Sequence, residues 1–231
     1  MKNALIALLC AVGLIALALT GALTGLQVVF LDSNRYTALM DELDVYDDVG
    51  ISREEQILIN GDLAAYLAGR TDSLDRPVTL KGEAVSSPFN EREISHMEDV
   101  RRLFRIGLNA RAALAAAAVV FLAAGFLLGK RRARRAGILI SLFLMTAAGI
   151  LAAILLAHAD FNALFIRFHE LVFSNDLWLL DPETDAMIRM LPEPFFESMA
   201  AQGAFGAAIG LLVGFLAGAA ILNIPGRKDK A

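Results

Sequence analysis

Four long stretches of apolar residues constrain this chain more than any other feature of its sequence. Residues 3–31 and 198–226 are uncharged over their whole length, and shorter apolar stretches lie at 112–129 and 136–157. A bilayer core of about 30 Å needs about 20 apolar residues to cross it as a helix, so each stretch is long enough to span a membrane. We therefore predict an all-α, polytopic membrane protein with four transmembrane helices, at about 4–31, 112–129, 136–157 and 200–224.

The composition agrees with this class of protein. Of the 231 residues, 57% are hydrophobic, a fraction above that of ordinary soluble domains. Too few residues lie outside the apolar stretches for a large soluble domain, so we expect a single membrane domain over 1–231. The one cysteine, Cys10, excludes an internal disulfide framework and a cysteine-rich metal site. Because Leu9 precedes it where a lipidation signal needs a small residue, we expect Cys10 to be buried in a helix.

The distribution of charge predicts the orientation in the membrane. The short segment 130–135 and the C-terminal tail 225–231 are basic, and Lys2 starts the chain. Basic loops stay in the cytoplasm, so both termini are predicted to be cytoplasmic. The outer face then receives segments 32–111 and 158–199, which hold 24 of the 25 acidic residues. The first span is longer than a signal-peptide core and lacks a clear cleavage site, so we interpret it as a retained anchor.

The first outer segment contains signals for short amphipathic helices. Ser52 and Glu55 form a capping-box pattern that predicts a helix ending near Gly69. Residues 77–80 suggest an extended piece. Asn90 offers a second N-cap, with Glu93 three residues later, and predicts a helix that continues toward the second span.

The second outer segment is short and rich in aromatic residues. Asp181 followed by Pro182 predicts the start of a short helix, which Pro192 ends. The aromatic residues suit either a belt at the membrane interface or a hydrophobic entrance for acyl chains. Four arginines close to the second span suit either snorkelling to headgroups or contact with an anion. These arginines are Arg101, Arg102, Arg105 and Arg111.

Three histidines, His96, His158 and His169, lie on the predicted outer side or at its membrane edge. An unperturbed imidazole has a pKa of about 6.5, which suits proton transfer near neutral pH. On a helix, Glu93, His96 and Asp99 share one face, so Asp99 is expected to orient His96. The alternative is a solvated, charged helix face.

His169 lies on an apolar stripe, because Phe165, His169 and Phe173 are spaced by four residues. A polar group on such a stripe needs a partner, so His169 is either catalytic or a hydrogen-bonded structural residue. For His158, at the end of the third span, we expect an interfacial role. No paired histidine spacing typical of a metal site and no glycine-rich phosphate loop is present, so we expect neither a metal nor a cofactor.

One long segment resembles a known family. Residues 168–196 read FHELVFSNDLWLLDPETDAMIRMLPEPFF, and a His-x-x-Asp-Val element lies at 96–100. Together with the four-span topology and the region around Tyr36, they resemble the bacterial lipoprotein intramolecular transacylase family. The resemblance extends over the whole chain in topology.

The resemblance implies an acyltransferase of the bacterial cytoplasmic membrane with its active site on the outer face. Members move an acyl chain from the glycerol sn-2 oxygen of a diacylglyceryl lipoprotein to the α-amine of its N-terminal cysteine. The expected partners are these lipoproteins and membrane lipids, with no nucleic acid. The family's two catalytic histidines correspond to His96 and His169, and Asn175 or Arg167 is expected to stabilise the oxyanion. The supporting residues are Asp99, Asn175, Tyr36, Arg167, Trp178 and Asp185.

Two other functions are compatible with parts of the sequence. A non-enzymatic scaffold or assembly protein would present the acidic outer segments to a partner, with His96 and His169 apart or facing solvent separately. A different interfacial hydrolase or a metalloenzyme would need a nucleophilic serine or further ligands beside the histidines.

Overall fold

The structure is a computed structural model that describes residues 1–156 and 160–226. The sequence-based expectations for His158, Arg227, Lys228 and Lys230 lie outside these residues. The chain forms two compact units. The membrane unit comprises the described residues of 1–26, 108–159 and 204–231, and the histidine unit comprises Gln27–Gly107 and Asp160–Gly203.

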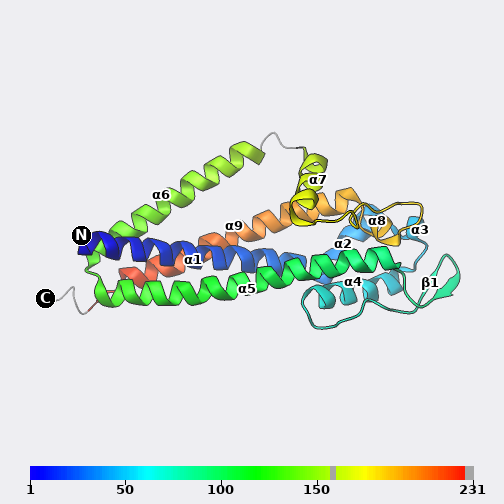
Figure 1. The fold of residues 1–231 in the computed structure, drawn as a ribbon, viewed down its shortest axis with the longest axis horizontal. Helices are drawn as coiled ribbons and strands as arrows, with labels where there is room; N and C mark the ends of the chain where they lie inside the picture. Colours follow the sequence, from blue (N-terminus) through cyan, green and yellow to red (C-terminus); the bar gives the residue numbers. More distant parts are fainter. Residues whose placement is uncertain (157–159, 227–231) are drawn as a thin grey trace. The chain divides into compact units, whose positions relative to one another are not determined.

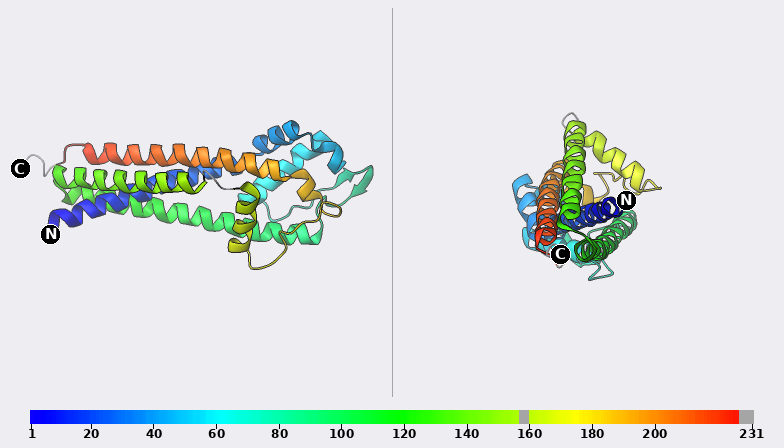
Figure 2. Two further views of the ribbon diagram at one scale, coloured as in Figure 1. Left: turned by 90° about the horizontal axis from the view of Figure 1, so that it is seen from above. Right: turned by 90° about the vertical axis from the view of Figure 1, so that its left-hand side faces the viewer.

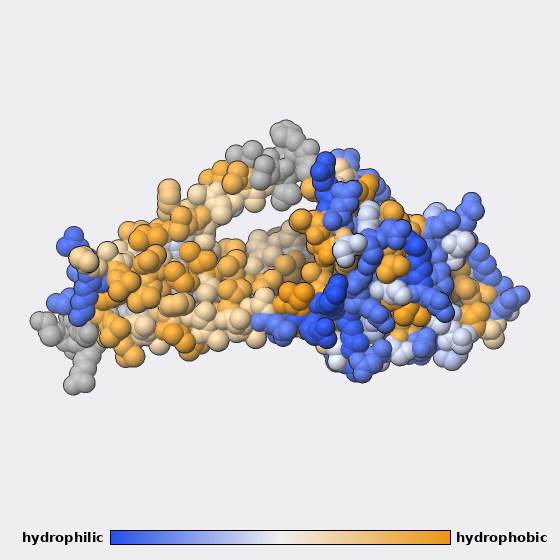
Figure 3. Space-filling model, viewed as in Figure 1, coloured by the Kyte–Doolittle hydropathy of each residue, from blue (hydrophilic) through white to orange (hydrophobic). Residues whose placement is uncertain are grey.

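Four long helices supply the membrane unit: α1 (Lys2–Phe30), α5 (Glu91–Leu128), α6 (Arg131–Leu156) and α9 (Glu193–Asn223) (Figure 1). Among the described residues, these four helices are long and apolar enough to cross a membrane, which confirms the predicted number of spans. The first part of α5, before Ala112, carries most of its charges, so its membrane-spanning part is the uncharged stretch that follows. Apolar side chains cover most of the visible surface of this unit, with hydrophilic residues at its far end (Figure 3).

Glycines bring α1 and α9 into direct backbone contact. A Cβ atom built on Gly21 would lie 1.9 Å from the carbonyl oxygen of Gly210, and one on Gly25 would lie 1.9 Å from that of Gly206. Only glycine permits this distance, and close approach of this kind is a common way to associate helices in lipid. Cys10 is fully buried in α1, as expected.

A buried arginine joins the helix ends of the membrane unit. Arg134, at the start of α6, donates to the carbonyl oxygens of Phe126 at 3.3 Å and Ile224 at 3.1 Å. Phe126 belongs to the last turn of α5, where the helix dipole places partial negative charge, and Ile224 directly follows α9. The cation therefore satisfies one acceptor at the end of α5 and one just beyond the end of α9. Beyond Ser141, α6 diverges from the other three helices, and its side chains are mostly exposed (Figures 1 and 2).

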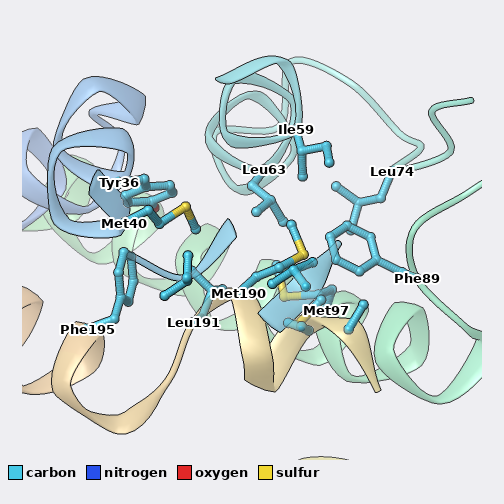
Figure 4. Packing of buried hydrophobic residues seen from close by; sticks show 14 of the residues in the cluster. Tyr36, Met40, Ile59, Leu63, Leu74, Phe89, Met97, Met190, Leu191 and Phe195 are labelled. Carbon is cyan, nitrogen blue, oxygen red and sulfur yellow. The ribbon is translucent and has the colours of Figure 1, made fainter. Parts of the chain in front are cut away.

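Shorter elements complete the histidine unit. Its helices are α2 (Ser33–Leu43), α3 (Tyr46–Val49), α4 (Arg53–Leu67), α7 (Phe161–Val172) and α8 (Ala186–Met190). Strands β1 (Val78–Leu80) and β2 (Glu83–Val85) form an antiparallel hairpin that pairs Val78 with Val85. Buried residues from α2, α4, α5, α8 and α9 share one hydrophobic core, which includes Tyr36, Ile59, Met97, Met190 and Phe195 (Figure 4).

Both predicted capping boxes form. The Ser52 hydroxyl accepts from the backbone N–H of Glu55 at 3.3 Å and donates to its carboxylate at 2.9 Å, at the start of α4. At the start of α5, the Asn90 side-chain oxygen accepts from the backbone N–H of Glu93 at 3.0 Å, and the Asn90 backbone N–H donates to the Glu93 carboxylate at 2.8 Å. Local sequence therefore determines where these two helices begin.

The short helix predicted before Pro192 is present as α8, but its predicted start at Asp181 and Pro182 is wrong. Asp181 accepts the backbone N–H groups of Glu183, Thr184 and Asp185 through its carboxylate and carbonyl oxygens, which closes a turn, and α8 begins only at Ala186. The Asp181 N–H donates in turn to the Asp185 carboxylate at 2.7 Å. Pro192 separates α8 from α9, and α9 starts at once at Glu193, seven residues before the predicted span at 200–224.

Candidate active site

Helix α7 presents His169 with one ring nitrogen already engaged. The His169 Nδ1 lies 2.7 Å from the carbonyl oxygen of Phe165, one turn earlier on the helix. A carbonyl oxygen only accepts hydrogen bonds, so we assign the proton of the neutral ring to Nδ1. The Nε2 atom then carries the lone pair, which is the state required of a base or a nucleophile.

Aromatic rings surround His169. The centroid of its imidazole lies 4.2 Å from that of Phe165, 4.9 Å from that of Trp178 and 5.3 Å from that of Phe168. The His169 side chain is buried, and this burial lowers its pKa because the apolar surroundings disfavour the imidazolium ion. The hydrogen bond to Phe165 acts in the opposite direction.

His96 lies on α5, in the turn that follows the Asn90 cap, and faces His169. The two ring centroids are 6.0 Å apart, and Phe173 packs against both imidazoles at 5.3 and 5.5 Å. Burial, with a smaller contribution from His169, lowers the pKa of His96 to about 4. Both imidazoles are therefore neutral at physiological pH and close enough to reach one substrate molecule.

The expected hydrogen bond between Asp99 and His96 is absent from the described part of the chain. The Asp99 carboxylate instead accepts from the side chains of Asn175 at 2.8 Å and Arg102 at 3.0 Å. The His96 Nδ1 is buried with no partner among residues 1–156 and 160–226. Asp99 shares the helix face of His96, as predicted, but its effect on that imidazole is a Coulombic rise in pKa that burial outweighs.

The loop after α7 is fastened to α5 by polar contacts. The side-chain amide of Asn175 donates to Asp99, and the backbone carbonyl of Asn175 accepts from the indole N–H of Trp178 at 3.0 Å. Arg92, one turn before His96, donates to the Asp176 carbonyl and lies 3.8 Å from its carboxylate. These contacts hold the Trp178 ring against His169. The contact of Arg92 with Asp176 was not predicted from the sequence. The position of Arg92 one helix turn before His96 was the one signal that could have pointed to it.

Tyr36, Asp185 and Arg167 have other surroundings in the structure. Tyr36 is a core residue that donates to the carbonyl of Phe30 and packs edge-on against Phe195 at 5.7 Å. Asp185 is buried and accepts from Asn90 at 2.7 Å, which ties the segment before α8 to the start of α5. Arg167 is exposed on α7.

Further polar contacts of α5 were also not predicted. The buried Glu93 carboxylate accepts the backbone N–H of Met187 at 2.5 Å and so joins α5 to α8. Arg101 pairs with Asp72 at 2.6 Å and lies over the Tyr66 ring at 4.6 Å. Thus at least two of the four arginines near the span, Arg101 and Arg102, serve contacts within the unit. No group of three or more metal-ligating side chains occurs in the described residues.

The fold and these two imidazoles define a membrane-integral helical protein with a buried pair of neutral histidines. Comparison with known proteins gives the class more closely. The chain belongs to the lipoprotein intramolecular transacylase family, whose profile matches residues 11–196, and it is therefore an acyltransferase. A search of curated protein sequences found no match.

Solved structures of a membrane-integral lipoprotein intramolecular transacylase from Bacillus cereus share the fold. One aligns with a TM-score of 0.71 at 21% identity, covering 99% of this chain and 98% of that chain. A variant of that protein with a histidine replaced by arginine gives a TM-score of 0.62 at 21% identity, covering 95% and 92%. The scaffold alternative required separated histidines, whereas the two rings lie 6.0 Å apart.

We expect His96 to titrate far below a free imidazole. Its native pKa of about 4 lies under the unfolded value of about 6.5, so the unfolded chain binds more protons between these pH values. The contribution of His96 to the free energy of unfolding should therefore be complete above pH 6.5, and the free energy of unfolding should fall as the pH drops toward 4. NMR titration of histidine-labelled protein, with His96→Gln to assign the signal, measures this midpoint. A midpoint between 6 and 7 would contradict the burial of the ring.

Proposed function

We propose that this protein moves the sn-2 acyl chain of a diacylglyceryl lipoprotein onto the α-amine of the lipoprotein's N-terminal cysteine, with His96 and His169 as the catalytic residues. The observation that carries the proposal is the pair of buried, neutral imidazoles 6.0 Å apart inside an aromatic enclosure. The products are an amide on the cysteine and a free hydroxyl on the glycerol, so no second lipid is consumed.

The reaction removes two protons from the amine nitrogen, one before the attack and one after it, supplies one proton to the glycerol oxygen and releases the other. The substrate α-amine has an ordinary pKa near 8, so it is mostly an ammonium ion at neutral pH and must lose a proton before it attacks. Attack forms the C–N bond at the ester carbonyl, and collapse of the tetrahedral intermediate breaks the bond to the sn-2 oxygen. That oxygen leaves as an alkoxide unless an acid protonates it.

Two routes fit the arrangement of the imidazoles. In the first, one neutral imidazole accepts the ammonium proton and returns it to the glycerol oxygen, while the second proton of the nitrogen passes through the other imidazole to solvent. In the second, the lone pair on His169 Nε2 attacks the ester carbonyl, and the glycerol oxygen leaves with the proton that His96 took from the ammonium. The amine then displaces the imidazole from this acyl-imidazole and loses its second proton to solvent. The hydrogen bond from Nδ1 to Phe165 supports His169 in both routes, because it fixes the ring and exposes the basic nitrogen.

The oxyanion of the intermediate needs a donor. Asn175 is the better candidate of the two considered, since it belongs to the loop that carries Trp178 to His169. Its amide nitrogen has two hydrogens, and the bond to Asp99 uses one of them. Removing a donor of this kind typically costs about 10²–10³ in rate.

The site is proposed to face the outer leaflet of the bacterial cytoplasmic membrane, with both chain termini in the cytoplasm. The positive charges of the segment 130–135 support this orientation. In a Cys10→Ser background, an impermeant maleimide should label Glu54→Cys in intact cells and label Lys130→Cys only after lysis. Both positions are exposed. The reverse pattern would place the histidines in the cytoplasm.

Mass spectrometry of a reporter lipoprotein tests the reaction. Expression in a bacterium that lacks N-acylation should yield the N-acyl, lyso-form N-terminal peptide, with the same total acyl mass as the diacylglyceryl form. Tandem spectra then place one acyl chain on the amine. A peptide that retains a free amine, despite verified membrane expression, would contradict the proposed activity.

A further inference from the structure

Helix α7 has a second face of large apolar side chains, which its own unit leaves largely exposed. Leu164, Phe168 and Leu171 follow the i, i+4, i+7 spacing of one helix stripe, and their exposed fractions are 43, 46 and 87%. On the neighbouring face, Phe165 and His169 point into the aromatic enclosure. A large leucine that is 87% exposed is costly in water, so this stripe requires an apolar partner.

The connection of α7 to the membrane identifies that partner. The apolar helix α6 ends at Leu156 and α7 begins at Phe161, five residues along the chain. Five residues reach at most about 18 Å, so α7 starts close to the end of a membrane-spanning helix. With 12 residues it is about 18 Å long, too short to cross a bilayer. An amphipathic helix in this position lies in the plane of the interface.

We propose that α7 is embedded in the lipid interface and that Leu164, Phe168 and Leu171 insert among the acyl chains. The occupant of the stripe is thus membrane lipid. Asp160 caps the helix, with its carboxylate accepting from Ala163 at 2.9 Å, and Asn162 donates to Glu193 at 2.8 Å at the start of α9. These polar contacts hold the N-terminal end of α7. None of the three stripe residues belongs to the hydrophobic core of the described residues, and the stripe meets other rings through Phe168, which lies 5.3 Å from His169 and 6.3 Å from Phe173.

This placement has a consequence that rests on the proposed function. His169 follows Phe168 directly and precedes Leu171 by two residues, so insertion of the stripe holds its imidazole within one helix turn of the acyl region. The ester bonds of a diacylglyceryl group lie at this depth. Helix α7 would then bring the imidazole to the ester, and the substrate would not need to leave the membrane.

Fluorescence measures the depth of α7 without any lipoprotein. Trp178 is the only tryptophan, so Trp178→Phe gives a background into which Leu171→Trp, on the stripe, and Glu170→Trp, on the exposed polar side, are introduced. The variants are reconstituted in phosphatidylcholine vesicles, with or without lipids brominated on the acyl chain. Circular dichroism and size-exclusion profiles that match the background establish that each variant folds.

We expect brominated lipid to remove most of the fluorescence of Leu171→Trp and little of that of Glu170→Trp. Aqueous iodide, loaded on both sides of the vesicle, should give the opposite order. If iodide quenches both variants equally and brominated lipid quenches neither of them, the stripe faces water and the proposal fails. Protection of Leu171→Trp from both quenchers would show that protein covers the stripe, which also overturns it. The expected quenching, together with a lack of transacylase activity in the protein that retains Trp178, would refute the proposed function alone.

Discussion

Replacing either His96 or His169 with alanine is expected to leave reporter lipoproteins in the diacylglyceryl form. Loss of a general acid or base typically reduces the rate by about 10²–10⁴, enough to abolish the N-acyl product in cells. If the two imidazoles act on one substrate, the double variant should be hardly worse than either single variant, because groups that work as a unit are not additive. The measurement is mass spectrometry of the reporter's N-terminal peptide.

Both histidines are buried, so alanine also leaves a cavity, and loss of folding has to be separated from loss of chemistry. His96→Gln and His169→Asn keep most of the side-chain volume and should be inactive yet stable. Glu98→Ala and Glu170→Ala are matched controls, since each removes an exposed carboxylate close to one histidine. Near-normal product from His96→Gln or His169→Asn would remove that residue from the mechanism.

The second large effect concerns the membrane unit. Gly210→Ala is expected to destabilise the protein, because the added Cβ would lie 2.0 Å from the carbonyl oxygen of Gly21 and the two helices must separate. Overpacking of this kind costs about 1–3 kcal/mol, and more where backbone is the obstacle. Thermal unfolding in detergent, followed by the loss of monodisperse protein, should show a lower Tm.

Gly149→Ala provides the matched control with the opposite sign. Gly149 lies within α6, and an added Cβ would meet no other atom within 4 Å. Alanine in a helix interior is more favourable than glycine by about 0.5–1 kcal/mol, so Tm should stay level or rise. Equal Tm values for the two variants would show that α1 and α9 do not pack through Gly21 and Gly210.

Much of this protein follows from local properties of the sequence. A spanning helix is recognised from the hydrophobicity of about 20 consecutive residues, so the four spans can be predicted without knowing which helices pack against them. Capping boxes involve residues three apart, and those at Ser52 and Asn90 form as predicted. The same reasoning failed at Asp181, where the side chain closes a turn, because one residue can stabilise a turn or a helix start equally well.

The membrane class, the number of spans and the histidines available for chemistry can all be read from the sequence. Which of these groups lie close together depends on the tertiary fold. His96 and His169 belong to helices far apart along the chain, and their distance of 6.0 Å depends on contacts of Asn175 and Asp99 across that separation. Asp99 has a carboxylate suited to an imidazole, yet it pairs with Asn175, since hydrogen-bond partners follow from packing and not from spacing alone. The lowered pKa of both histidines likewise arises from burial by aromatic rings that the fold brings together.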